Sequence, residues 1–596
     1  MALSEIEFPH SSQKQVPSPR TIVPYWLSIF ATLVPAAYVL YLALNAGDLP
    51  RNDYWSVLSR IYSINGFSTH LSDWLSRQNE HVMLISYLIY ALNIVAMRGS
   101  NIGLTLATWL FGVVQLLLLI ALLPHDEKDR SIVSVALIPC IAAFVFTPSA
   151  AHNWILGFSG VAWIGANMFV VGSIFCLARF SRDKHLAWAV CSLLLGLMAA
   201  LTYTTSLALW PVLCLGFVLV RSRLPLIGLA LALTGAVYFV FFSGYKALAG
   251  HPAPVYTDLY PLLYYTVIYL GSPFTTQAEL AAAIGAAGLV VSTIIFIVFL
   301  LQRSRETRSS LLPWVLLQFY AIGTSAMIAV GRSGFGATQA IASRYASLPA
   351  LFWIGLLVTA MLCFQQSYSG RPWSRRALVL AGLMTALLIL SMYRVGFSYA
   401  QTLFRQVSFQ PLVRLSVQLG IPDEQIIQLS ITPYPGQFLR NLPALDAGGH
   451  VPFNRKASSC GEVDQPFDLA MVYSASQLDL RGYFDFVDRF GDKGTRAVGW
   501  AYDPHGHVRC VVLVDRRGIV RGLGVSGFKR PDVAQALGLS DPYTGWVGYV
   551  PAPPRDEELV AYVLPHNDPH WVALENSQLF GASNDVKLAI YRSMVE

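Results

Sequence analysis

Charged residues are scarce in this sequence. Only 13% of its 596 residues are Asp, Glu, Lys or Arg, whereas 55% are hydrophobic, and the mean hydropathy is +0.51. Soluble domains carry roughly twice that charged fraction. The composition excludes a soluble enzyme, a disordered tail protein and a nucleic-acid binder with a basic face. It predicts an integral membrane protein that is surrounded by membrane lipids.

Cysteines are few, and the seven in the chain form no metal-binding or disulfide-framework spacing. Five lie in apolar stretches, where cysteine behaves as a small hydrophobic residue. Cys460 and Cys510 are the only cysteines in the more polar C-terminal part. Because we place that part in an oxidising compartment, we expect the two to form a disulfide. A thiolate metal site is the alternative, but the sequence offers no further ligands for it.

Acidic residues are nearly missing from the middle of the chain. Between Ser131 and Ala400 there are four of them, namely Asp183, Asp258, Glu279 and Glu306. After about residue 400 the sequence has mixed charges, Gly-Asp turns and short alternating strands. We therefore expect a transmembrane domain over residues 1–396, a connecting amphipathic helix over 397–425 and a β-rich domain over 426–596.

The long apolar stretches predict an α-helical, polytopic protein of about 11 transmembrane helices, since a span needs about 20 apolar residues. The first stretch follows Lys14 and Arg20 and is too long for a signal-peptide core, so we expect an uncleaved helix. The predicted spans are approximately 22–45, 101–124, 131–148, 160–178, 185–203, 206–221, 225–243, 277–302, 311–331, 346–364 and 377–395.

The segment 82–97 is apolar but short for a span. If it lies at the outer surface, the N-terminus and the cytoplasmic loops hold about 15 Lys and Arg, against about 7 in the outer loops. If it is counted as a span, every later loop moves to the opposite side of the membrane, and most of these Lys and Arg residues then lie outside. We therefore expect a surface helix, a cytoplasmic N-terminus and an external C-terminal domain. A short twelfth span is the alternative. The net charge of +7 then reflects mainly this topology.

Four stretches of alternating hydrophobicity in the C-terminal domain predict an antiparallel β-sandwich. They read AVGWAYDP, HVRCVVLVDRRGIVRGLGVSG, GWVGYVPA and ELVAYVLP. Aromatic residues of short strands usually lie in the core, so we expect these in the core, and a sugar-stacking platform is the alternative. These residues are Trp500, Tyr502, Trp546 and Tyr549.

Two carboxylates stand out in the predicted first outer loop, residues 46–100. Asp53 follows the first span within Leu-Pro-Arg-Asn-Asp-Tyr-Trp, and Glu80 stands in Arg-Gln-Asn-Glu-His before the surface helix. Ionisable groups near the membrane are costly and mark functional sites. Either carboxylate can act as a general base on an acceptor hydroxyl. The structural alternative is that each caps the helix that follows it.

Other predicted outer segments supply cations and polar groups. Arg332, Arg344 and Tyr345 lie in GRSGFGATQAIASRY, and an arginine pair there can bind a phosphate bidentately. Interfacial snorkelling is the alternative for these arginines. Two further groups are expected at the same face: Lys246 and His251 of the loop 244–276, and His152, Asn153 and Trp154 of the loop 149–159.

At these residues the chain resembles the GT-C superfamily of membrane glycosyltransferases, which use polyprenyl-phosphate-linked sugars. Members carry an acid in the first outer loop, matched here by Asp53. The stretch Gln78-Asn79-Glu80-His81 before 82–97 resembles the loop acid and surface helix of protein mannosyltransferases and lipid A aminoarabinose transferases. The chain is also similar to an uncharacterised bacterial group of multi-span proteins with the ordered motifs QNEH, HNWILGF, GRSGFGATQAIASRY, GWAYDP and RPDVA.

Two features depart from the superfamily pattern. The first-loop acid stands alone after Asn52, where many relatives have paired acids, and the WWDxG-type motif of oligosaccharyltransferases is missing. The second departure argues against transfer of a preassembled glycan to asparagine.

The resemblance implies an inverting glycosyltransferase of the bacterial inner membrane, with a periplasmic C-terminal domain. It would move one sugar from a polyprenyl-phosphate donor to a glycan or lipid acceptor. Asp53 or Glu80 would be the base, and no cofactor is required, although Glu80 and His81 could bind a divalent cation. The predicted phosphate-binding residues are Arg332, Arg344, Tyr345 and Lys246, and the predicted substrate-lining residues are His81, His152, Asn153 and Trp154.

Two alternatives from other classes stay open. One is a transporter or flippase of a lipid-linked envelope precursor, which typically shows internal repeats and broken helices. The other is a non-catalytic scaffold whose β-domain binds envelope glycan.

Overall fold

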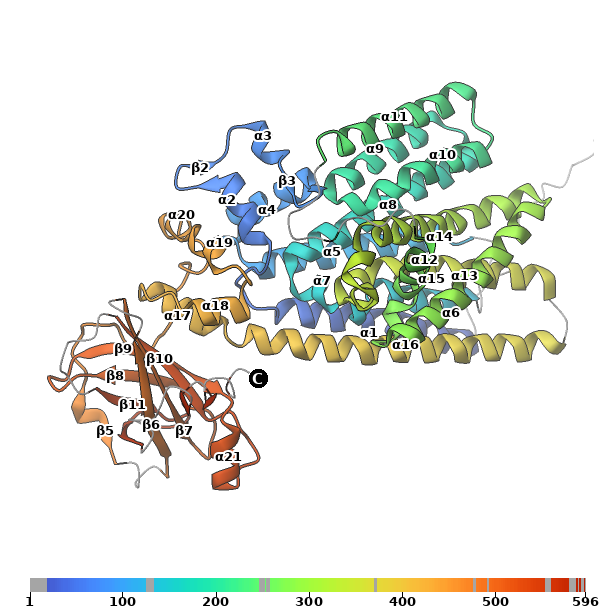
Figure 1. The fold of residues 1–596 in the computed structure, drawn as a ribbon. Coiled ribbons are helices and arrows are strands. Elements are labelled where there is room, and N and C mark those ends of the chain that lie inside the picture. Colours follow the sequence, from blue (N-terminus) through green and yellow to red (C-terminus); the bar gives the residue numbers. More distant parts are fainter. Residues whose placement is uncertain are drawn as a thin grey trace, which may run out of the picture. The chain divides into compact units, whose positions relative to one another are not determined.

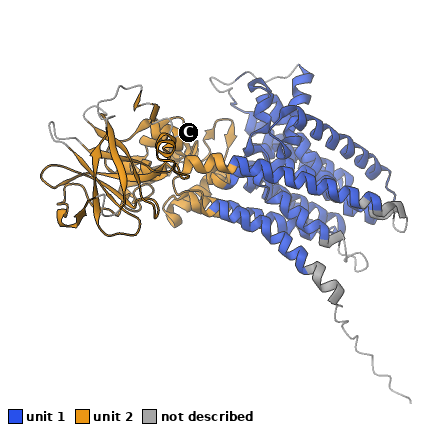
Figure 2. Cartoon of the chain, turned by 90° about the horizontal axis from the view of Figure 1, so that it is seen from below, with its two compact units in different colours: residues 1–43, 108–154, 163–399 blue, residues 44–107, 155–162, 400–596 orange. Residues whose placement is uncertain are grey.

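The structure is a computed structural model that divides into two compact units, coloured separately in Figure 2. Unit 1 contains residues 1–43, 108–154 and 163–399, and unit 2 contains residues 44–107, 155–162 and 400–596. The residues that the structure describes are 19–124, 133–245, 252, 258–368, 372–474, 479–489, 493–551, 559–577, 586–587, 589–590 and 594.

Unit 1 is a bundle of long apolar helices (Figure 1). Within the described residues, nine helical segments are long and apolar enough to cross a membrane, which indicates a membrane-embedded protein. The helices that contribute to unit 1 are α1 (Pro19–Leu44), α5 (Asn101–Leu122), α6 (Val133–Val145), α7 (Ala151–Ile155), α8 (Gly157–Asp183), α9 (Leu186–Thr202), α10 (Leu209–Leu219), α11 (Leu224–Phe242), α12 (Leu259–Gly271), α13 (Ala278–Leu301), α14 (Arg305–Arg332), α15 (Ser347–Tyr368) and α16 (Pro372–Val407).

Among the residues that the structure describes, the predicted number of eleven spans is not reached. The segments predicted at 185–203 and 206–221 are helical, but α9 has 17 residues and α10 only 11. At about 1.5 Å per residue α9 measures roughly 26 Å, which is less than the roughly 30 Å of a bilayer core. The ends also differ: α14 and α16 extend well beyond the predicted spans 311–331 and 377–395.

Helix α12 was not predicted, because its 13 residues fall within the expected loop 244–276. It packs closely on α13 through glycines. A Cβ atom added to Gly285 would lie 1.9 Å from the Val267 carbonyl oxygen, and one added to Gly271 would lie 2.0 Å from the Ala281 carbonyl oxygen. Small residues of this kind allow helix backbones to approach within membranes, where apolar burial drives helix association weakly.

A buried amide connects three helices of unit 1. Gln318 of α14 accepts a hydrogen bond from Ser292 of α13 at 2.7 Å and donates to Thr359 of α15 at 3.1 Å. Its amide nitrogen also lies 3.3 Å from the Trp314 carbonyl oxygen. The polar groups that hold these helices together are therefore neutral.

Unit 2 contains short elements from the first loop and from the segment after α16. The helices are α2 (Tyr54–Ile61), α3 (Leu71–Trp74), α4 (Leu84–Met97), α17 (Gln410–Gln418), α18 (Glu424–Ser430), α19 (Pro435–Leu439) and α20 (Leu442–Ala447), and the two hairpins are β1 (Tyr62–Ser63) with β2 (Gly66–Phe67) and β3 (Arg77–Gln78) with β4 (His81–Val82). Helix α4 has 14 residues, or roughly 21 Å, so its length fits the predicted surface helix better than a span.

The C-terminal strands form a closed barrel, so the predicted sandwich is wrong. Seven strands follow the order β11-β8-β9-β10-β7-β6-β12, and β12 also pairs with β11, which closes the sheet. Strand β12 pairs in parallel with β6, and a short strand, β5, adds to β12. The strands are β5 (Val472–Tyr473), β6 (Arg481–Arg489), β7 (Gly494–Tyr502), β8 (Cys510–Val514), β9 (Val520–Phe528), β10 (Gly545–Pro551), β11 (Val560–Leu564) and β12 (Trp571–Asn576), with helix α21 (Pro531–Leu537) between β9 and β10.

All four predicted strand stretches are confirmed as β7, the β8–β9 hairpin, β10 and β11. The barrel core is apolar and includes Phe484, Leu513, Trp546 and Val563.

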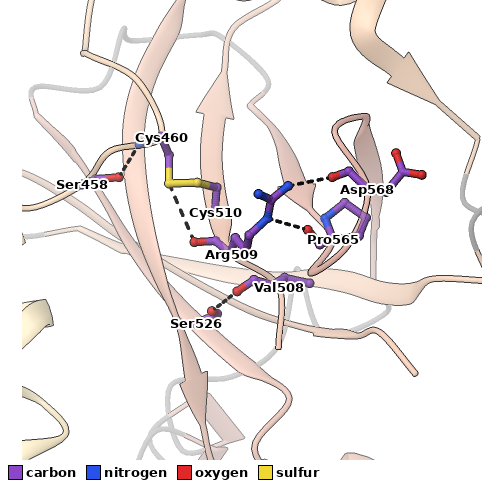
Figure 3. The surroundings of a disulfide bond; sticks show 8 residues. All are labelled: Ser458, Cys460, Val508, Arg509, Cys510, Ser526, Pro565 and Asp568. Carbon is purple, nitrogen blue, oxygen red and sulfur yellow. Dashed lines mark hydrogen bonds between the residues drawn. A yellow bond between two sulfur atoms is a disulfide. The ribbon is translucent and has the colours of Figure 1, made fainter. Parts of the chain in front are cut away.

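The predicted disulfide between Cys460 and Cys510 is confirmed (Figure 3). It joins the segment before the barrel to β8, with the two Cα atoms 5.5 Å apart. The adjacent Arg509 side chain donates hydrogen bonds to the carbonyl oxygens of Pro565, at 3.0 Å, and Asp568, at 2.8 Å. The bridge thus stands in a well-connected part of the barrel wall.

Candidate functional site

Asp53 occupies the N-cap position of α2, but its carboxylate makes no capping hydrogen bond. Instead, the Asp53 carbonyl oxygen accepts from the backbone N–H groups of Ser56 and Val57, each at 3.2 Å. The turn is anchored by Trp55, which is fully buried and donates to the Pro50 carbonyl oxygen at 2.9 Å. The alternative in which this carboxylate caps α2 is therefore wrong. The Asp53 side chain is half-buried and stands on a turn whose backbone is fixed.

Glu80 also does not cap a helix, because the N-cap residue of α4 is Met83. Gln78 pairs with His81 across the β3–β4 hairpin, so Asn79 and Glu80 form its two-residue turn. Asn79 has φ 53°, a left-handed conformation that asparagine tolerates well. A Glu80 carboxylate oxygen lies 3.7 Å from His81 Nε2, and both side chains are largely buried.

The described residues contain no group of three or more His, Cys, Asp and Glu side chains that could hold a metal ion. A cation at the β3–β4 turn would therefore have two protein ligands, Glu80 and His81. The proposed chemistry does not depend on such a cation.

Arg51 is a functional candidate that the sequence analysis missed. Its side chain is 4% exposed and donates through Nη2 to the side-chain oxygen of Gln406. Its Nε and Nη1 atoms are buried and have no hydrogen-bond partner among the described residues. Burial lowers the pKa of Arg51 to about 10. The sequence signal was present, since Arg51 lies two residues before Asp53, but the burial that distinguishes it is tertiary.

In unit 1, Arg344 and Tyr345 lie together in a short 3-10 turn between α14 and α15. The Arg344 guanidinium carbon is 4.8 Å from the centroid of the Tyr345 ring, and Nη2 lies 3.4 Å from the Tyr345 hydroxyl. Tyr345 is buried against Trp163 and Tyr269, with ring centroids 5.4 Å away in both cases. A cation is thus held at the edge of a buried aromatic cluster, an arrangement that strengthens its attraction to ring faces.

Arg332 ends α14, and its guanidinium carbon is 5.6 Å from the Phe335 ring centroid. Arg332 and Arg344 both act electrostatically on the Tyr265 hydroxyl, so the structure brings both cations to one region of unit 1. Burial lowers the pKa of Arg344, but the neighbouring phenols, Tyr345 foremost, raise it, and the net shift is upward. Arg344 is therefore cationic at any physiological pH.

The His152–Trp154 motif contacts the Arg344 turn through its backbone and amide groups. Asn153 donates to the Arg344 carbonyl oxygen at 2.9 Å, and the His152 N–H donates to the Ser343 hydroxyl at 3.1 Å. Trp154 is fully buried and donates to the Thr147 carbonyl oxygen at 2.8 Å. Asn153 positions the backbone that carries Arg344, and Trp154 packs in the core. Lys246 and His251 lie outside the described residues.

The expected burial of the barrel aromatic residues is confirmed for Trp500, Trp546 and Tyr549, and Tyr502 is half-buried, so the alternative of a sugar-stacking platform is not supported. Trp546 and Tyr549 are fully buried and Trp500 is 9% exposed, whereas stacking on a sugar needs an exposed ring face. The motifs GWAYDP and RPDVA have structural contacts as well. Asp503 accepts from the backbone N–H groups of His505 and His566, and Arg530 pairs with Asp485 and Asp532.

The candidate residues therefore form two groups, each within one unit. Unit 2 holds Arg51, Asp53, Glu80 and His81, and unit 1 holds Arg332, Arg344, Tyr345, His152 and Asn153. No protein-family model and no curated protein matches this chain.

Proposed function

We propose that this protein is an inverting glycosyltransferase of the GT-C type that moves a single sugar from a polyprenyl-phosphate donor to a glycan or lipid acceptor. The proposal also places the enzyme in a bacterial cytoplasmic membrane, with the reaction on the outer side. The observation that carries it is the Arg344 guanidinium, a permanent cation beside a buried aromatic cluster between two long apolar helices.

A lipid phosphate has the properties that a ligand of Arg344 needs at this position between two apolar helices. Its isoprenoid chain is soluble in the hydrocarbon layer, and its head group is an anion at the membrane boundary. A planar guanidinium can bind two phosphate oxygens at once, and its charge favours the phosphate as it departs. Asn153 adds to this role indirectly, because its bond to the Arg344 carbonyl fixes the backbone of the turn.

Asp53 is the preferred base, and Glu80 is the second candidate. The base removes the proton of an acceptor hydroxyl, and the resulting oxygen forms a bond to the anomeric carbon of the donor sugar. The bond between that carbon and the phosphate oxygen breaks, and the phosphate leaves with the electron pair. Attack opposite the leaving group inverts the anomeric centre. Asp53 is suited to this role because its half-buried acid stands on a turn whose backbone is fixed by hydrogen bonds.

The disulfide supports an outer location for the barrel. Disulfides persist in oxidising compartments such as the periplasm and are rare in the cytosol. The Cys460–Cys510 bridge therefore agrees with the orientation that the Lys and Arg distribution favours.

Sugar transfer in membrane vesicles tests the proposal. Asp53→Asn should abolish transfer from a polyprenyl-phosphate sugar while leaving folding intact, because the amide keeps the shape of the acid. Asp73→Asn, in the same loop, is the matched control, since Asp73 binds the Ser68 hydroxyl. Full activity of Asp53→Asn would exclude Asp53 as the base and transfer that role to Glu80. Full activity of both Asp53→Asn and Glu80→Gln would exclude the mechanism.

The phosphate role has its own test. Arg344→Lys should weaken donor binding by about tenfold or more, because an ammonium group cannot reproduce a bidentate fork. Arg223→Lys is the control, since Arg223 is exposed and precedes α11.

Mass spectrometry of envelope glycans from a deletion strain would identify the sugar: one residue should be missing from the glycans and its lipid-linked donor should accumulate.

A further inference from the structure

Four arginines of unit 2 are nearly inaccessible to solvent: Arg51 (4% exposed), Arg414 (3%), Arg496 (5%) and Arg530 (1%). Three of them have carboxylate partners. Arg414 pairs with Asp48, Arg496 with Asp423 at 2.9 Å, and Arg530 with Asp532 at 2.7 Å. A buried charge is costly unless it is paired and hydrogen-bonded, and these three arginines follow that rule.

Arg51 does not follow the rule. Its one hydrogen bond goes to Gln406, a neutral amide, and its Nε and Nη1 atoms have no partner among the described residues. Burial lowers the pKa of Arg51 to about 10, so the group keeps its proton at neutral pH. Unsatisfied buried donors are rare in native proteins, and each requires an explanation such as a missing ion.

The backbone around Arg51 is fixed in place. The Gln410 side chain accepts from the Leu49 N–H at 3.0 Å and donates to the Leu49 carbonyl oxygen at 3.1 Å. On the other side, the Asn52 N–H donates to the Ile431 carbonyl oxygen at 2.7 Å. Asp48, the nearest acid before Arg51 in the chain, is bound to Arg414 and Arg455. The backbone on both sides of Arg51 is thus held in place, and Asp48 pairs with other arginines.

We propose that Arg51 is the cationic group of a phosphate-binding subsite in unit 2. Nη2 carries two hydrogens, one beside Nε–H and the other beside Nη1–H, and Gln406 accepts one of them. The other Nη2 hydrogen and the N–H group beside it remain as a pair of donors for two phosphate oxygens. The bound group is a phosphate mono- or diester, as in a lipid-linked sugar donor or its phosphate product. This assignment rests on the proposed function for the identity of the ligand but not for the existence of the site.

Thermal unfolding of the full-length protein tests the proposal. The protein is purified in a maltoside detergent, which carries no phosphate, and is melted with sodium phosphate, with decaprenyl phosphate or with phosphatidylglycerol, each against sodium chloride at equal ionic strength. A ligand that binds only the folded state raises the melting temperature, by about 5 °C near a hundredfold excess over Kd. A response to decaprenyl phosphate alone identifies a lipid-linked ligand, and a response to sodium phosphate shows that the ion suffices.

The variants separate binding from structure. Arg51→Met should lose the phosphate-dependent increase and should melt at or above the wild-type temperature without phosphate, because it removes an uncompensated buried charge. Arg414→Met, the matched control, should melt lower than wild type, since it leaves Asp48 without its buried partner, and should keep the phosphate-dependent increase. Arg51→Lys should need about tenfold more phosphate for half of the increase, because its ammonium group lacks the fork.

Two results overturn the subsite. One is a wild-type protein whose melting temperature responds to none of the three phosphate compounds. The other is an Arg51→Met variant that keeps the full response. The sugar-transfer assay is independent: loss of the phosphate response in Arg51→Met together with full transfer by Asp53→Asn and Glu80→Gln would leave the subsite standing and exclude the glycosyltransferase mechanism.

Discussion

The two units stabilise their buried polar groups in different ways. In unit 1, neutral side chains bind one another and the backbone, as Gln318 does with Ser292 and Thr359. In unit 2, buried arginines pair with carboxylates, as Arg496 does with Asp423. Unit 1 helices expose large apolar side chains such as Phe239 and Leu301, so the surroundings of the bundle are apolar as well as its interior. Formal charge is costly there, whereas unit 2 can use it in compensated pairs.

The difference shows which groups need an explanation. Within unit 2, a buried guanidinium with a carboxylate is ordinary and one without it, Arg51, is the exception. Within unit 1, where buried polar groups are mostly neutral, a half-buried cation against an aromatic ring, such as Arg344 beside Tyr345, is an exception. Both exceptions carry positive charge, and both fit an anionic ligand.

The largest expected effect comes from breaking an ion pair of unit 2. Asp423 is fully buried, binds Arg496, accepts from the Tyr549 hydroxyl at 2.8 Å and caps α18. Asp423→Ala should destabilise unit 2 by about 3–5 kcal/mol, because it leaves a buried cation poorly compensated. Hydrogen exchange of peptides from 410–430 and 494–551 measures the loss. Glu424→Ala, an exposed neighbour, should change exchange little, and equal effects of the two variants would contradict the role of the pair.

Removing the covalent link of unit 2 should have the next largest effect. Cys460 and Cys510 are separated by 50 residues, so the bridge restricts a long loop in the unfolded chain. The Cys460→Ser/Cys510→Ser double variant should lose about 2–4 kcal/mol of barrel stability. Urea unfolding followed by barrel tryptophan fluorescence would measure it. Dithiothreitol should reproduce the loss in wild type and leave the double variant unchanged; a wild type insensitive to the reductant would contradict the prediction.

Removing the hydrogen bonds of the neutral Gln318 amide in unit 1 should reduce stability less than breaking an ion pair of unit 2. Gln318→Leu removes the amide between α13, α14 and α15 but fills most of its volume. The expected loss is about 1 kcal/mol, in the range measured for hydrogen bonds between membrane helices. Thermal melting in detergent would detect it. Thr385→Val is the control, since the Thr385 hydroxyl makes a solvent-exposed hydrogen bond to the Ala381 carbonyl oxygen within α16. A loss as large as that of Asp423→Ala would remove the distinction between the units.

Much of the fold followed from composition and periodicity. Long apolar stretches identified the membrane helices, and alternation identified β7 to β11, because both patterns are local. Barrel closure was missed, since β12 reaches both β6 and β11 by pairings that no local pattern reveals. The 13-residue α12 was missed because it is too short to be recognised as a span. The disulfide was predictable, since only two cysteines occur in the C-terminal domain.

The candidate site was predicted in part. Motif position brought attention to Asp53, Glu80 and Arg344. The contact between Asn153 and the Arg344 turn shows that two of the segments predicted to lie outside the membrane are in contact. The sequence could not distinguish Arg51 from Arg414, because the difference lies in a partner, Asp48, that packing assigns to only one of them. It did favour burial of the barrel aromatic residues over a sugar-stacking platform, and three of the four side chains are buried.

The smallest expected effect concerns a neutral histidine of unit 2, and it tests whether charge in this unit must be compensated. His450 Nε2 lies 2.9 Å from the Tyr62 hydroxyl, and burial, together with the charge of Arg98, lowers the pKa of His450 below its ordinary 6.5. The unfolded chain therefore binds a proton first as the pH falls, so stability should decrease below about pH 6.5 and level off below the folded-state pKa. Melting temperatures at pH 7.5 and 5.5 measure this decrease, which His450→Gln should reduce and His507→Gln, at an exposed position, should not. Identical acid sensitivity of wild type and His450→Gln would show that this histidine is protonated without cost, and that a cation beside Arg98 needs no partner.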